Sequence, residues 1–172
     1  GPAPDPSAPP LGRFGVRQSF DLIVLLSSFG VARAFASPAA RSRQSLTPWA
    51  SMGGGSVTLV ESLDLTASGS DAQVDAEARL GRVRAFAAQR LREHAAPTVL
   101  SVAGPARAAI IEEIRAFASA PVAGAEAPRL ERGQVLVAHI EHGPDGLAVA
   151  APETHGVPTT DPTVHARQAH KQ

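Results

Sequence analysis

The feature that most constrains this chain is an apolar run that breaks at Gly104-Pro105 and resumes at once with helical spacing. Residues 98 to 103 are apolar with little alternation, which is typical of a strand covered on both faces. After Pro105, which suits the first turn of a helix, Ile110, Ile114 and Phe117 recur at spacings of three and four. The stretch therefore predicts a strand that leads directly into a helix, the unit from which layered α/β domains are built.

Two further patterns lie upstream of this unit. Residues 57 to 66 alternate between apolar and polar side chains, which predicts a half-buried strand. Glu61 falls on the apolar side of that alternation, which indicates either a bulge or strand edge, or a functional position. Apolar residues then recur at helical spacing from Ala72 to about Ala95, which predicts the longest helix of the chain.

Downstream, residues 134 to 142 and 147 to 151 flank the turn sequence Gly-Pro-Asp-Gly, which predicts a β-hairpin. The expected order is β-α-β-α-β-β. We therefore expect an α+β fold, or a small α/β fold, built as a two-layer sandwich with two helices on one face. The domain is expected to span residues 56–156, with a flexible polar tail at 157–172.

The N-terminal segment has a different composition. Five prolines in the first ten residues favour an irregular chain, and a glycine run precedes Ser56. We expect residues 1–55 to be a largely disordered leader that contains one short apolar segment, 20–32. That segment is shorter than the roughly 20 residues needed to span a bilayer. It is compatible with a secretory signal, with a mitochondrial presequence because of its flanking arginines, or with a helix that packs on the domain.

Composition excludes several classes of function. The chain has 16 basic and 16 acidic residues, so no overall field attracts nucleic acid, and we do not expect nucleic acid as a partner. It has no cysteine, which rules out disulfides, thiolate metal sites and thiol nucleophiles. Any chemistry must use imidazole, carboxylate, guanidinium or hydroxyl groups, and the compartment stays undetermined.

One candidate site is an anion site where the strand at 98–103 meets its helix. Gly104 allows a close approach to the backbone, and amides at the start of a helix favour a negative charge. Arg107 lies one turn into that helix. Pro105 removes one of the amide donors, and a strand-to-helix turn needs glycine for steric reasons alone.

A second candidate is a divalent metal site formed by His139, Glu141 and His155. In an extended strand His139 and Glu141 share a face, and the hairpin can bring His155 or Glu153 across from them. Two imidazoles and a carboxylate suit zinc or a similar ion. The alternative is that these are ordinary solvated hairpin residues.

No catalytic constellation converges in this sequence. We therefore expect a non-catalytic binding or assembly module, a subunit of a larger complex or a homo-oligomer, with a protein partner and no cofactor. The opposing hypothesis is a small metal-dependent hydrolase that uses the cluster His139, Glu141 and His155.

Overall fold

The computed structural model describes residues 10–65, 72–118, 130, 133–150 and 152–156, with the side chains of residues 72–74 not described. The elements follow one another as helix, strand, helix and strand, and the chain ends in short strands. In chain order they are α1 (Arg13–Ser28), β1 (Arg33–Ala36), α2 (Ala40–Trp49), the π-helical turn η1 (Ala50–Gly54), β2 (Val57–Leu59), the 3-10 turn η2 (Glu61–Leu63), α3 (Ala72–Arg92), β3 (Thr98–Ser101), α4 (Gly104–Ala116), β4 (Val135–Val137), β5 (Ile140–Gly143), β6 (Gly146–Val149) and β7 (Glu153–His155).

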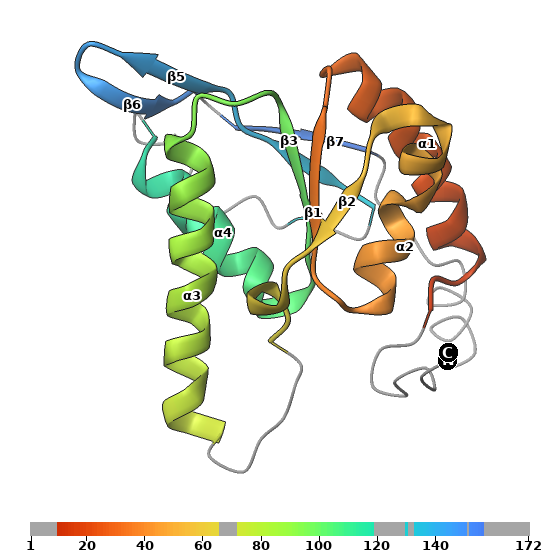
Figure 1. Cartoon of the computed structure of the whole chain (residues 1–172), viewed down its shortest axis with the longest axis horizontal. Helices are drawn as coiled ribbons and strands as arrows, with labels where there is room; N and C mark the ends of the chain where they lie inside the picture. Colours follow the sequence, from red (N-terminus) through yellow and green to blue (C-terminus); the bar gives the residue numbers. More distant parts are fainter. Residues whose placement is uncertain (1–9, 66–71, 119–129, 131–132, 151, 157–172) are drawn as a thin grey trace, which may run out of the picture.

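A three-stranded parallel sheet with the order β2-β1-β3 forms the centre of the fold (Figure 1). Ala34 of β1 is paired with Val57 of β2 on one side and with Val99 of β3 on the other. Parallel neighbours need a crossover, and α2 and α3 supply the two crossovers between these strands. The strand that comes first in the sequence is therefore the middle strand of this sheet.

Helices α1 and α2 pack together on one face of the sheet (Figure 1). Ala34 and Ala36 are buried there, at 2% and 0% exposure, against Leu46 and Trp49 of α2. The small alanine side chains leave room for the indole ring between the helices and the strand. Leu26 of α1 closes the same cluster and is 3% exposed.

The opposite face of the sheet is covered by α3 and α4, which pack against each other (Figure 1). Side chains alternate along a strand, so Phe35 points away from its two alanine neighbours. Its ring meets Phe86 of α3 edge to face, with centroids 5.4 Å apart, and the guanidinium of Arg90 lies over both rings. The apolar cluster on this side is formed by Leu63, Val83, Ala87, Ala106, Ala109 and Ile110.

The remaining strands form two small antiparallel pairs, β4 with β7 and β5 with β6. They are attached to α4 by Val149, which is 1% exposed and donates its backbone N–H to the carbonyl of Phe117 at 2.9 Å. A further backbone bond joins Ala150 to the carbonyl of His139.

The expected α+β mixture is confirmed, and the two helices predicted at 72–95 and after Gly104 lie together on one face as α3 and α4. The prediction of a disordered leader over residues 1–55 is wrong for residues 10–55. They form α1, β1, α2 and η1, and they supply the middle strand and a third layer. A four-residue strand and helices of 16 and 10 residues have little stability in isolation, so tertiary packing rather than local sequence preference stabilises this layer. Residues 1–9 and the tail at 157–172 lie outside the described residues.

Three predicted strands differ from the observed ones. The strand at 57–66 ends at Leu59, and Glu61 begins a 3-10 turn that leaves its own side chain exposed while burying Leu63. The strand at 134–142 is divided into β4 and β5, which pair with different partners. The strand at 98–103 is covered on both faces as expected, but within the described residues it lies at the edge of the sheet.

Residues 20–28 of the apolar segment 20–32 belong to helix α1, which packs on the domain, one of the three interpretations that its sequence allows. Among the residues that the structure describes, no helix combines the length and the apolar character needed to cross a membrane.

We predict that Leu26→Ala lowers the free energy of unfolding by about 2–5 kcal/mol, because it opens a cavity between α1, β1 and α2. Val24→Ala, two residues away on the same helix but 72% exposed, is the matched control and should change that free energy by less than about 0.5 kcal/mol. Urea unfolding followed by the single tryptophan, Trp49, measures both. Equal midpoints for the two variants would show that α1 is not part of the cooperative fold.

Candidate functional site

The sheet has a topological switch point between β1 and β3. The chain leaves β1 toward α2 on one face, and it leaves the neighbouring strand β3 toward α4 on the other face (Figure 1). The carboxyl ends of the two strands meet in register, Ala36 beside Ser101. In open parallel sheets a crevice forms where adjacent connections diverge in this way, and ligands bind there.

Both helices that begin at this crevice lack a side-chain cap. The N-cap of α2 is Ala39 and that of α4 is Ala103, and neither makes a side-chain capping bond. Alanine is among the poorer N-cap residues, costing about 1 kcal/mol relative to serine or aspartate. Neither first turn contains an acidic residue. The positive ends of two helix dipoles therefore lie at one edge of the sheet without a carboxylate from either first turn.

Four serines hold the crevice together. Ser37 and Ser42 are buried, and the Ser37 hydroxyl donates to the Ser42 hydroxyl at 2.9 Å. The hydroxyls of Ser45 and Ser101 are 2.8 Å apart and join α2 to the end of β3. The backbone N–H of Ser37 also donates to the carbonyl of Ser101 at 3.0 Å. The start of α2 is thereby fixed to the ends of both strands.

The two segments that follow β1 and β3 carry only positive charges. Residues 37–45 and 101–107 contain Arg41, Arg43 and Arg107, and they contain no Asp, Glu, His, Cys, Lys or Tyr. These two segments can bind a negative charge through amides, hydroxyls and guanidinium groups. They supply no side chain suited to act as a general base at neutral pH.

The two residues predicted for an anion site both lie in the first turns of α4. Gly104 has φ +52°, a left-handed conformation that favours glycine, and a Cβ there would meet no atom within 4 Å. The space above Gly104 is therefore open. Arg107, three residues further along the helix, is half-buried. The two residues predicted for an anion site therefore lie at the switch point. The prediction did not include β1 or α2, because both lie in the segment that was expected to be a leader.

The residues predicted for a metal site are separated. His139 and His155 both approach Glu153, whose Oε1 lies 3.0 Å from His139 Nε2 and 3.2 Å from His155 Nε2. The first contact is a hydrogen bond, whereas the second lacks hydrogen-bond geometry. Phe29, at the end of α1, contacts both imidazole rings, with centroids 6.2 and 5.3 Å away.

Glu141 lies outside this cluster. It is on β5, which pairs with β6, whereas His155 is on β7, and its side chain is exposed. Among the described residues no group of three or more His, Cys, Asp or Glu side chains is arranged to hold a metal ion. The cluster of His139, Glu153 and His155 instead joins the small strands to the end of α1.

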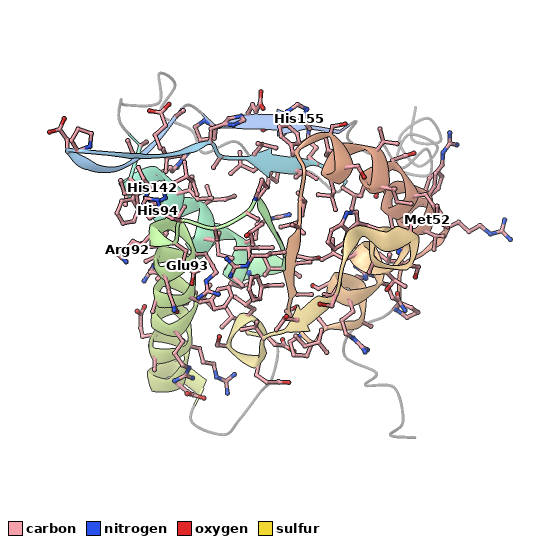
Figure 2. All side chains as sticks on the ribbon, turned by 45° about the horizontal axis from the view of Figure 1, so that its top comes forward. Met52, Arg92, Glu93, His94, His142 and His155 are labelled. Atoms are coloured by element: carbon pink, nitrogen blue, oxygen red, sulfur yellow. The ribbon has the colours of Figure 1, made fainter. Side chains whose placement is uncertain are left out.

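A second pair of imidazoles lies at the other end of the hairpin. His94, just after α3, stacks on His142 of β5 with ring centroids 3.8 Å apart (Figure 2). Arg92 and Glu93 lie beside them in the figure. Arg92 lies over the ring of Phe117, and Glu93 pairs with Arg33 and Arg90. The contact between His94 and His142 connects the β5–β6 hairpin to the end of α3. The charged side chains beside it, Arg92 and Glu93, already have partners within the fold.

The serines of the crevice were missed by sequence reasoning because β1 was assigned to the leader. The signal that could have found them is Ser37-Pro38 directly after the apolar run Val31 to Ala36, followed by a segment of helical spacing through Leu46 and Trp49. A four-residue strand is too short for its alternation to be distinguished from chance.

The fold and the crevice together define an α+β chain with a doubly wound parallel sheet and a polar, positively charged switch point. No protein-family model matches the chain. No curated protein matches it either.

We predict that His139→Gln raises the pKa of Glu153. In the native protein the hydrogen bond from His139, followed by the contact with His155, lowers that pKa below its ordinary value of 4.5, while burial acts in the opposite direction. The stabilisation linked to this lowered pKa is fully present above pH 4.5 and is lost as the pH falls through the lowered pKa. Carbon-detected NMR titration of the Glu153 carboxyl measures the midpoint in both proteins, and an unchanged midpoint in the variant would contradict the assignment.

Proposed function

We propose that this chain is a non-catalytic binding module whose switch-point crevice binds a small anion of the phosphate or phosphate-ester class. The observation that carries the proposal is the convergence of two uncapped helix starts, at Ala39 and Ala103, on one edge of the sheet. Backbone amides at such positions donate to phosphate oxygens, and the helix dipoles favour the negative charge.

Three features beyond the helix starts support an anion. Arginine is the only ionisable residue type in the two segments that form the crevice. Gly104 has open space above it, so a ligand atom can approach the backbone closely. The hydroxyls of Ser37, Ser42, Ser45 and Ser101 place polar groups where the start of α2 meets the ends of β1 and β3.

The same residues favour binding over catalysis. Hydrolysis of a phosphate ester needs a nucleophile or an activated water and a group that moves a proton. The serine hydroxyls in the crevice bond to one another, and no imidazole or carboxylate belongs to segments 37–45 and 101–107 to activate them. The metal-dependent hydrolase alternative gains no support. Glu141 lies apart from His139 and His155, and the described residues contain no group of three or more His, Cys, Asp or Glu side chains arranged to hold a metal ion.

We predict that Ala103→Asp weakens the binding of phosphate at least about tenfold and, at the same time, stabilises the fold by about 0.5–2 kcal/mol. The new carboxylate would cap α4 and occupy the position of the anion. Titration with inorganic phosphate and with phenyl phosphate, followed by amide NMR, measures affinity. Shifts are expected at Ala40, Ser42, Gly104 and Ala106, and thermal unfolding measures stability.

The matched control is Gly12→Asp. Gly12 is the uncapped N-cap residue of α1, which does not begin at the end of β1 or β3, and a Cβ there would meet nothing within 4 Å. This variant should also gain stability, while its affinity for phosphate should stay unchanged. The proposal fails if phosphate moves no amide at the starts of α2 and α4, or if both aspartate variants bind phosphate as the native chain does.

A further inference from the structure

Helix α1 is apolar on its outward face as well as on its inward face. Val16, Phe20 and Val24 follow one another at intervals of four residues, so they form one stripe along the helix. Their side chains are 44%, 57% and 72% exposed. The inward face is already packed, with Ser19 and Leu26 buried. A contiguous exposed apolar stripe of this kind marks an interaction surface.

A groove runs beside this stripe, between α1 and α2. It is a cavity of about 270 Å³ open to solvent, and Leu11, Val16 and Pro48 contribute apolar walls. Gln44 and Thr47 line its α2 side, and Gln44 accepts a hydrogen bond from the backbone N–H of Leu11 at 2.8 Å. The concave surface is of the kind that accepts side chains of an amphipathic helix.

The charges of these two helices are strongly unbalanced. Helices α1 and α2 carry four arginines, at positions 13, 17, 41 and 43, and their only acidic residue is Asp21. All five side chains are exposed. The chain as a whole has a net charge of zero, so positive charge is concentrated on this layer.

We propose that the groove between α1 and α2, with the stripe Val16, Phe20 and Val24, binds an acidic amphipathic helix of a partner protein. Apolar residues of that helix would cover the stripe and enter the groove. Its acidic flanks would face Arg13, Arg17 and Arg43, and complementary charges of this kind steer association and fix orientation. The inference rests on different observations from the anion site, namely the exposed stripe of α1 and the groove beside it, although Arg43 and Gln44 belong to α2, which also starts at that site.

The other occupants fit this surface less well. A second copy of the chain would bring four more arginines against the same face, and like charges oppose that contact. A bilayer surface is flat on this scale and would leave the groove unfilled. The chain's own terminal residues, 1–9 and 157–172, contain one acidic residue each, so they lack the charge that the surface selects.

The test uses the full chain and a fluorescent synthetic helix about 18 residues long, which is five turns. The peptide has leucines along one face and glutamates on both flanks, and a second peptide carries lysines in place of the glutamates. We expect the acidic peptide to bind with micromolar affinity and the basic one at least about tenfold more weakly. Phe20→Ala should weaken the acidic peptide by about tenfold or more, since it removes the central anchor. Arg17→Glu should weaken the acidic peptide and strengthen the basic one.

Phe14→Ala is the matched control, because Phe14 is equally exposed, at 59%, but lies about 120° around the helix from Phe20. It should leave affinity unchanged, and thermal unfolding should be the same for both phenylalanine variants. Equal affinity for the two peptides, or no effect of Phe20→Ala, would overturn the proposal. Dimerisation that light scattering detects and that Phe20→Ala abolishes would also overturn the proposal. Stronger binding to vesicles of phosphatidylserine and phosphatidylcholine than to the acidic peptide would overturn it as well. The absence of acidic-peptide binding up to roughly 1 mM would also overturn it.

Discussion

The burial of β1 on both faces is the constraint on which the rest of this structure depends. Its alanines accept Trp49 and Leu46 on one side, and Phe35 meets Phe86 and Arg90 on the other. Because β1 hydrogen-bonds to strands on both edges, it also supplies the template for the parallel sheet. Removing residues 10–55 would therefore leave both β2 and β3 without their hydrogen-bonded neighbour, and residues 56–156 alone could not keep this arrangement.

The same topology creates the crevice. A parallel strand order of β2-β1-β3 makes the connections after β1 and β3 diverge to opposite faces, and this brings two helix starts to one edge. Because the N-cap residue is alanine in both α2 and α4, neither helix has a side-chain capping bond at its start. Helix α1 is also uncapped, at Gly12, so what distinguishes this edge of the sheet is that two uncapped helix starts meet there.

The C-terminal strands are attached to this framework by a few specific contacts. Val149 bonds to the end of α4, His94 stacks on His142, and the imidazoles of His139 and His155 contact Phe29 around Glu153. These imidazoles were candidates for a metal site, but the fold uses them to connect elements that lie far apart in the sequence. The separation of Glu141 follows from the division of the predicted strand 134–142 into β4 and β5, which pair with different partners.

The sequence by itself determined the long periodic elements: the helices that became α3 and α4, the strand between them, the hairpin, and Gly104 as a point of close backbone approach. These signals are local, because spacing and turn residues decide them. Only the tertiary structure decided that β1 is the middle strand, that α1 and α2 form a layer, and that Ser37, Ser42, Ser45 and Ser101 meet. The physical reason is that a four-residue strand and a ten-residue helix that contains Pro48 have little stability of their own. They are stabilised by neighbours that the chain brings together only on folding, such as Thr98 paired with Arg33.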